Sequence, residues 1–152
     1  MELLVDLHTH TTASGHAYST VTENALAASR RGIKLLGMTD HGPSMPGAPP
    51  LYYFGNLSVL PPELSGVRIL PGVEANIVNF EGELDMPQKY LEQLSLILVG
   101  LHPICYPGGT CEENTSAYLK AMANPYTDMM VHPGRPDFTM DLDRIAHASA
   151  EL

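Results

Sequence analysis

The sequence is poor in basic residues and has no long apolar run. It contains 8 Lys and Arg against 17 Asp and Glu, a formal net charge of −9, and the basic residues are scattered. Nucleic-acid-binding proteins usually carry a clustered basic surface, so no nucleic acid is expected as a partner. No apolar stretch approaches the roughly 20 residues of a membrane span, and an acidic residue, Glu2, stands where a secretory signal would carry basic ones. These absences predict a cytoplasmic protein with no membrane partner.

Cysteine is also scarce. Cys105 and Cys111 form neither a CxxC motif nor a disulfide framework, so both are expected to be reduced. The hydrophobic fraction of 44% and charged fraction of 16% are those of a globular protein. Because 152 residues is an ordinary domain length and no linker or repeat interrupts it, we expect one domain over residues 1–152.

Short β-branched runs alternate with helix-like stretches, which predicts βα units around a parallel sheet. A complete (β/α) barrel usually needs about 250 residues, so the expected α/β fold is an incomplete barrel of about five units. The expected strands are 3–7, 33–39, 67–77, 94–101 and 127–131, and the expected helices are 22–31, 114–124 and 141–152.

Histidines gather where the predicted strands end. In parallel α/β folds this edge of the sheet binds ligands and carries active sites. One histidine there is more often a structural hydrogen-bonding residue, but six with a carboxylate indicate a metal cluster. The candidate ligands are His8, His10, His16, His41, Glu74, His102 and His132, whereas the seventh histidine, His147, falls in the last predicted helix and is expected to have a surface or packing role.

These ligand types indicate a chemistry. Imidazole suits Zn, Mn or Fe, and a carboxylate can bridge two such ions. Neutral histidines do not cancel the metal charge, so the cluster would attract phosphate even in a protein of net charge −9. Neighbouring metals can activate a water nucleophile and stabilise the attacked phosphate. The sequence therefore predicts metal-assisted hydrolysis of a phosphate ester.

Other residues near the predicted site allow two interpretations. Asp6 and Asp40 precede histidines and would either orient them or fix the loop backbone. Arg135 would contact a substrate phosphate or form a surface ion pair. The aromatic run 52–54 would form part of a lid or substrate wall, or pack under the Pro-rich loop 43–50.

Five ordered motifs contain these candidate ligands: Asp6-Leu7-His8-Thr9-His10, Thr39-Asp40-His41-Gly42, Gly72-Val73-Glu74-Ala75-Asn76, Gly100-Leu101-His102 and Val131-His132-Pro133-Gly134. They resemble the motifs of the PHP (polymerase and histidinol phosphatase) superfamily. The resemblance covers nearly the whole chain, and the segment between the first two motifs, His16-Ala17-Tyr18-Ser19-Thr20, is closest to the YcdX-like phosphatases.

The resemblance implies a distorted (β/α)7 barrel with a trinuclear site, often of zinc. In that arrangement His8 and His10 bind one metal, and Glu74 bridges it to a second. His102 and His132 complete the second site.

By the same resemblance, His16 and His41 bind the third metal. The candidate catalytic residues are Glu74, His102 and Arg135. The implied activity is a phosphatase acting on a small phosphomonoester.

One family motif has no counterpart. PHP proteins continue with further βα units and a late Ser-Asp-Ser-His-like motif, whose Asp and His are metal ligands, and residues 140–152 resemble the helix before the next strand. We therefore expect the N-terminal portion of a PHP barrel, completed by further chain or by association with a second copy. Two other functions stay open: an inactive metal-binding module and a PHP-type nuclease, against which the acidic composition argues.

Overall fold

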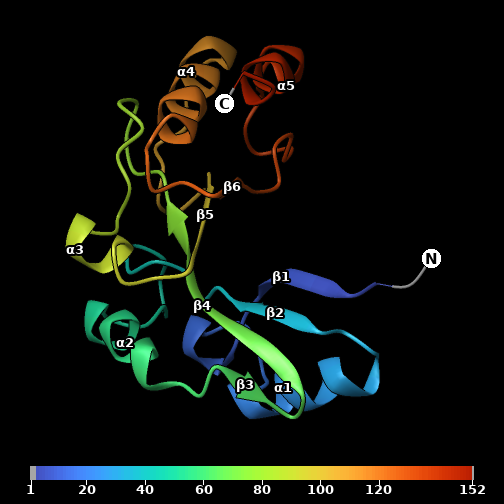
Figure 1. The fold of residues 1–152 in the computed structure, drawn as a ribbon. Coiled ribbons are helices and arrows are strands. Elements are labelled where there is room, and N and C mark those ends of the chain that lie inside the picture. The colour runs from blue at the N-terminus through green and yellow to red at the C-terminus, as the bar shows by residue number, and fades with distance from the viewer. Residues whose placement is uncertain (1–2, 152) are drawn as a thin grey trace.

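A curled, mainly parallel sheet organises the chain in the computed structural model, which describes residues 3–151. The sheet forms a half-barrel, visible edge-on in Figure 1, so the predicted α/β fold and incomplete barrel are confirmed. The strand order is β1-β2-β4-β5-β6, and a short β3 pairs antiparallel with β4. The strands are β1 (Val5–Thr9), β2 (Leu35–Met38), β3 (Glu63–Leu64), β4 (Val67–Asn76), β5 (Leu96–Gly100) and β6 (Met129–Met130).

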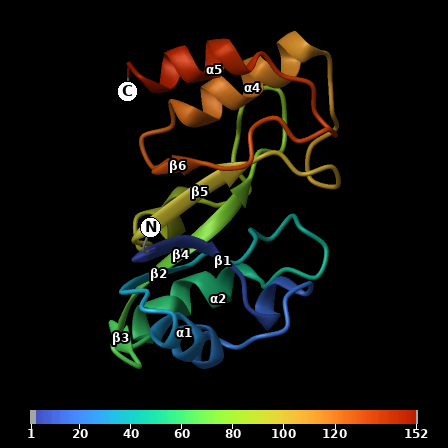
Figure 2. The same ribbon diagram turned by 90° about the vertical axis from the view of Figure 1, so that its right-hand side faces the viewer.

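Each parallel strand is followed by a helix, which gives the five βα units expected. Figure 2 shows α1 and α2 on the side of β1 and β2, and α4 and α5 on the side of β5 and β6. Within residues 3–151 no helix combines the length and apolar character that crossing a membrane requires. The helices are α1 (Val21–Arg30), α2 (Leu51–Asn56), α3 (Gln88–Leu91), α4 (Cys111–Met122) and α5 (Leu142–Ser149), with 3-10 turns at Thr12–Ser14 and Leu57–Val59.

Capping residues decide where the two longest helices begin. Thr20 starts α1 and Thr110 starts α4, each accepting a hydrogen bond from the backbone of a glutamate three residues on. In return, the side chain of that glutamate accepts a hydrogen bond from the threonine N–H, an arrangement called a capping box. Two backbone N–H donors at the start of each helix are thereby satisfied. The box at Thr110 explains why α4 starts three residues before the expected position.

Successive side chains along β4 and β5 point to opposite faces of the sheet, and both faces are apolar. The convex face of β4 and β5 packs under the helices through Val73, Ala75, Ile97 and Val99. Side chains two residues apart on a strand share a face, so the opposite set on these strands lines the concave side, where Leu96, Leu98 and Val131 pack together with Leu7, Leu70 and Met129. Glu74 belongs to this concave set, above an apolar floor.

Candidate metal centre

Glu74 lies on β4 at the centre of the sheet's C-terminal edge. Its backbone pairs with Leu98 of β5 on one side and forms a parallel bridge with His41 on the other. The Glu74 N–H donates to the Asp40 carbonyl at 3.0 Å, and the Gly42 N–H donates to the Glu74 carbonyl at 2.9 Å. This pairing extends β2 beyond its last residue and brings His41 beside a carboxylate that is only 1% exposed.

Five histidine rings surround the Glu74 carboxylate. Each places one ring nitrogen within 3.2 Å of a carboxylate oxygen, and the five come from the ends of β1, β2, β5 and β6. We call Glu74 and these five residues the Glu74 cluster: Oε2 lies 3.2 Å from His8 Nε2, 3.2 Å from His10 Nε2 and 2.9 Å from His41 Nδ1, while Oε1 lies 3.1 Å from His102 Nε2 and 2.7 Å from His132 Nε2.

Hydrogen bonds alone do not satisfy this cluster. His41 Nδ1 and Glu74 Oε2 face each other at 2.9 Å, yet both are buried without an aligned hydrogen-bond partner. Two ligand atoms that bind one ion at about 2.1 Å stand about 3.0 Å apart at a right angle and about 3.4 Å apart at the tetrahedral angle usual for zinc. The spacing and the unpaired atoms therefore fit a carboxylate that shares cations with its imidazoles.

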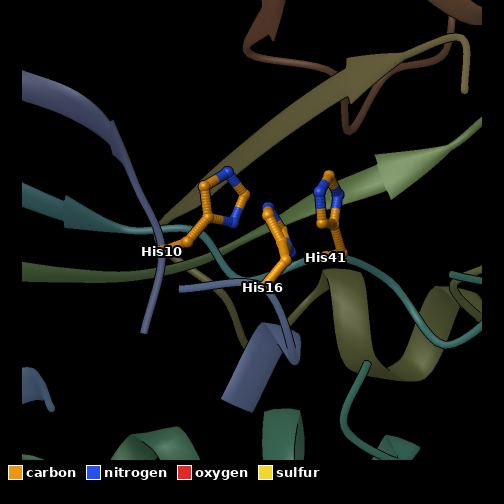
Figure 3. A group of neighbouring side chains, drawn as sticks. All are labelled: His10, His16 and His41. Carbon is orange, nitrogen blue, oxygen red and sulfur yellow. The ribbon is translucent and has the colours of Figure 1, made fainter. Parts of the chain in front are cut away.

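A second group of histidines adjoins the cluster. His10, His16 and His41, which we call the three-histidine group, offer ring nitrogens that lie within 4.8 Å of one another. Their ring centroids are 4.6–5.2 Å apart, and Figure 3 shows the three rings side by side above the sheet. Two further triads with ligand spacing are His8, His10 and Glu74, and His41, Glu74 and His102. The six histidines and the glutamate singled out from the sequence thus meet in one place, while His147 lies apart on α5 and bonds to the Asp143 carbonyl.

The electrostatics suit metal ligation. Burial alone would raise the pKa of Glu74, but the surrounding imidazoles, His10 first, hold it well below the usual range, so this carboxylate stays ionised. Burial lowers the pKa of His41 against the opposing pull of Glu74, which keeps that ring neutral. The adjacent Glu74 carboxylate raises the pKa of the more exposed His8. Metal binds neutral imidazole and ionised carboxylate, which are the forms favoured for His41 and Glu74, whereas at His8 the raised pKa means that a proton competes with metal.

The position of the His132 ring requires a glycine at residue 100. The backbone of His132 has φ +36°, which is unusual for a residue with a side chain. A Cβ on Gly100 would stand 2.7 Å from His132 Cε1, so only glycine leaves room for this ring beside β5. The Tyr118 hydroxyl holds the preceding turn by donating to the Val131 carbonyl at 3.1 Å.

Asp40 organises the loops around the site rather than touching a ring. Its carboxylate accepts hydrogen bonds from the Thr11 N–H and hydroxyl, the Ser14 hydroxyl and the Tyr53 hydroxyl, at 2.6–2.8 Å. Of its two expected roles, the structure therefore shows the fixing of loop backbone. Asp6 accepts a 3.3 Å hydrogen bond from the His8 N–H, which is also a backbone contact.

The three aromatic residues of the run 52–54 have different environments. Phe54 is buried in the core, the Tyr53 hydroxyl reaches Asp40, and Tyr52 is 79% exposed. Burial, together with the hydrogen bond to Asp40, raises the pKa of Tyr53, so its hydroxyl stays protonated and remains a donor. No sequence pattern indicated the hydrogen bonds of Ser14 and Tyr53, because neither residue stands at a strand end.

The histidines form the floor of a cleft of about 510 Å³. Arg135 lies at its wall, and the side chains of Met45, Pro103 and Ile104 complete the lining. The Arg135 guanidinium contacts Asp137 through Nε at 3.2 Å and Nη2 at 3.0 Å. A larger hollow of about 770 Å³ between α4, α5 and β6 has no histidine or glutamate in its lining, so the candidate metal ligands gather at the smaller cleft.

Comparison with known families decides the relationship. A model of the PHP domain matches residues 6–131, a span that contains every residue of the Glu74 cluster except His132. The chain belongs to the PHP family. The PHP resemblance that the five motifs carry is therefore confirmed.

Curated PHP relatives extend this result. The chain is 53% identical over 151 residues to a protein of Acetivibrio thermocellus named "Probable phosphatase", and 50% identical over 152 residues to one from Thermoanaerobacter sp. with the same description. A third such relative, from Clostridium botulinum, is 48% identical over 151 residues. Each match covers 99% of this chain but only 62–63% of the relative, so the chain spans less than two thirds of their length.

Proposed function

We propose that this chain carries most of the metal centre of a phosphatase that hydrolyses small phosphomonoesters. The supporting observation is the buried Glu74 carboxylate, which faces five imidazoles with the spacing of shared metal ligands. The names of the PHP relatives agree with this function. The ions are expected to be zinc, with manganese or iron as alternatives, because imidazole with carboxylate suits all three.

The residues of the chain divide the work. Glu74 would hold the ions together with His8 and His10, which lie beside its Oε2, and with His102 and His132, which lie beside its Oε1. Divalent ions bound there would supply a nucleophilic water at neutral pH and positive charge for the attacked phosphoryl group. The apolar floor under Glu74 lowers the local dielectric and strengthens each of these interactions.

Arg135 would bind the substrate phosphate. Its Nε and Nη2 are engaged by Asp137, which leaves the Nη1 donors available on a guanidinium whose orientation is already set. The cleft of about 510 Å³ suits a small molecule rather than a polymer. A monoester has a doubly charged terminal phosphate, for which an arginine beside a metal cluster is well matched.

The decisive experiment measures hydrolysis of p-nitrophenyl phosphate by the purified chain with added Zn²⁺ or Mn²⁺. We expect hydrolysis that a chelator removes and fresh metal restores. Metal binding without hydrolysis would favour the inactive metal-binding module. Degradation of single-stranded DNA in preference to the monoester would favour the PHP-type nuclease.

Substitution of Arg135 tests the substrate contact. Arg135→Ala is expected to raise KM for the monoester about tenfold, since a charge-assisted hydrogen bond in a half-open cleft contributes about 1.4 kcal/mol. Arg144→Ala is the matched control, because Arg144 is an exposed arginine paired with Glu112 outside the cleft. Equal KM values for the two variants would remove Arg135 from substrate binding.

A further inference from the structure

Ser14 forms hydrogen bonds with all three members of the three-histidine group. It ends the 3-10 turn Thr12–Ser14 and is only 1% exposed. Its hydroxyl lies 3.2 Å from His10 Nδ1 and 3.1 Å from the His41 backbone nitrogen. Its carbonyl oxygen lies 3.0 Å from His16 Nδ1.

The directions of these hydrogen bonds follow from the chemistry of the partners. The Ser14 hydroxyl is 2.6 Å from Asp40 Oδ1, and an ionised carboxylate only accepts, so Ser14 donates its single proton there. Its oxygen is then left to accept from the His41 N–H and from His10 Nδ1–H. A carbonyl oxygen also only accepts, so His16 carries its proton on Nδ1 as well.

These assignments determine which ring nitrogens can bind metal. With the proton on Nδ1, the Nε2 atoms of His10 and His16 keep their lone pairs and become the ligand atoms. The His41 N–H bond to the same hydroxyl fixes the backbone from which the third ring projects. One serine therefore sets the tautomer of two rings and the position of the third.

Two further residues hold Ser14 in place. Asp40 is buried and receives the Thr11 N–H and hydroxyl besides that of Ser14. Tyr53, from α2, donates to Asp40 Oδ2 at 2.6 Å. The two hydrogen bonds from Tyr53 to Asp40 and from Ser14 to Asp40 thus connect helix α2 to the three-histidine group.

We infer that Ser14, supported by Asp40 and Tyr53, is a positioning residue that selectively sets the metal affinity of the three-histidine group. The inference rests on the metal centre of the proposed function but not on its hydrolytic activity. The ions that His10, His16 and His41 help to hold should weaken together. His102 and His132 lie beside the other oxygen of Glu74, Oε1, and have no hydrogen bond with Ser14, so an ion held by them should respond little.

The test is a Co²⁺ titration of the purified chain, followed by the visible absorption of bound Co²⁺ and by calorimetry. Ser14→Ala is expected to weaken one class of ion 10–100-fold, the usual effect of losing a partner that orients a metal-binding histidine. The remaining ions should change less than about threefold. Ser14→Thr keeps the hydroxyl and should restore the affinity and the spectrum.

Two more variants separate positioning from loss of structure. Tyr53→Phe removes one distant hydroxyl and should weaken the same class of ion by a smaller factor. Thr115→Val is the matched control: Thr115 is a buried hydroxyl that donates to the Cys111 carbonyl and accepts from the Asp141 N–H, away from the cleft. It should leave every affinity unchanged.

Each result decides the matter. Unchanged affinities in Ser14→Ala, or a uniform loss of all ions matched by Thr115→Val, would overturn the role of Ser14 while leaving the metal centre intact. A wild-type chain that binds no Co²⁺ would overturn the metal centre itself. Selective loss without any phosphomonoester hydrolysis would support Ser14 and count only against the proposed phosphatase activity.

Discussion

Glu74→Gln is expected to abolish metal-dependent hydrolysis and to remove most of the bound metal. The amide keeps the shape of the side chain but loses the negative charge, and one of its two oxygens becomes an NH₂ group that cannot bind a cation. Both sides of the Glu74 cluster are affected, because His8 and His10 face one oxygen while His102 and His132 face the other. We expect at least a 10³-fold fall in kcat/KM, about 4 kcal/mol of transition-state stabilisation.

The measurements for this variant are metal content by elemental analysis and kcat/KM for p-nitrophenyl phosphate. Glu92→Gln is the matched control, since Glu92 is an exposed carboxylate that bonds to Gln88 and Tyr126 outside the cleft. Glu74→Gln with normal metal content would show that the histidines suffice as ligands. Normal activity would exclude Glu74 from the reaction.

Metal removal is expected to lower the melting temperature of the wild-type chain by about 10 °C. An ion that binds only the folded chain at about 1,000 times its Kd adds about 4 kcal/mol to the free energy of unfolding. In a chain of this size each kcal/mol moves Tm by about 2–4 °C. The metal-free chain also retains the buried unpaired atoms His41 Nδ1 and Glu74 Oε2, whose desolvation is uncompensated.

Thermal unfolding followed by circular dichroism, with and without EDTA, gives this shift directly. Re-addition of Zn²⁺ after removal of the chelator should restore the original Tm. Glu74→Gln supplies the internal comparison, because a chain that has lost most of its metal should respond to EDTA by only a few degrees. A wild-type Tm that is insensitive to chelation would mean that no metal contributes to the stability of the folded chain.

Local features of the sequence predicted which helices and strands are present more accurately than they predicted where each one begins and ends. The strand expected at 3–7 lies at Val5–Thr9, which places His8 within β1, and the strand expected at 127–131 shortens to Met129–Met130 in β6. The helix expected at 114–124 begins at Cys111 because the capping box at Thr110 outweighs the pattern of apolar residues that follows. The helix expected at 141–152 is α5, Leu142–Ser149, and residue 152 lies outside the described range.

The sequence by itself determined the family, the five βα units and the identity of the clustered histidines. This was possible because strand and helix periodicities are local, and because parallel strands necessarily bring their C-terminal ends to one edge. Which oxygen of Glu74 faces which ring depends on the pairing of β4 with its neighbours and on the irregular register of β1 between Asp6 and Thr9. A shift of one residue in either would turn these side chains to the opposite face.

Only the tertiary structure revealed the role of Ser14. The serine lies where the sequence shows no strand or helix pattern. Its partner Asp40 is 26 residues away, and Tyr53, which donates to Asp40, is 39 residues away. Hydrogen bonds between such distant residues arise from the packing of loops and helices around the sheet, which no local periodicity encodes. The sequence thus identified the candidate metal ligands, and the tertiary structure revealed the hydrogen bonds that orient them.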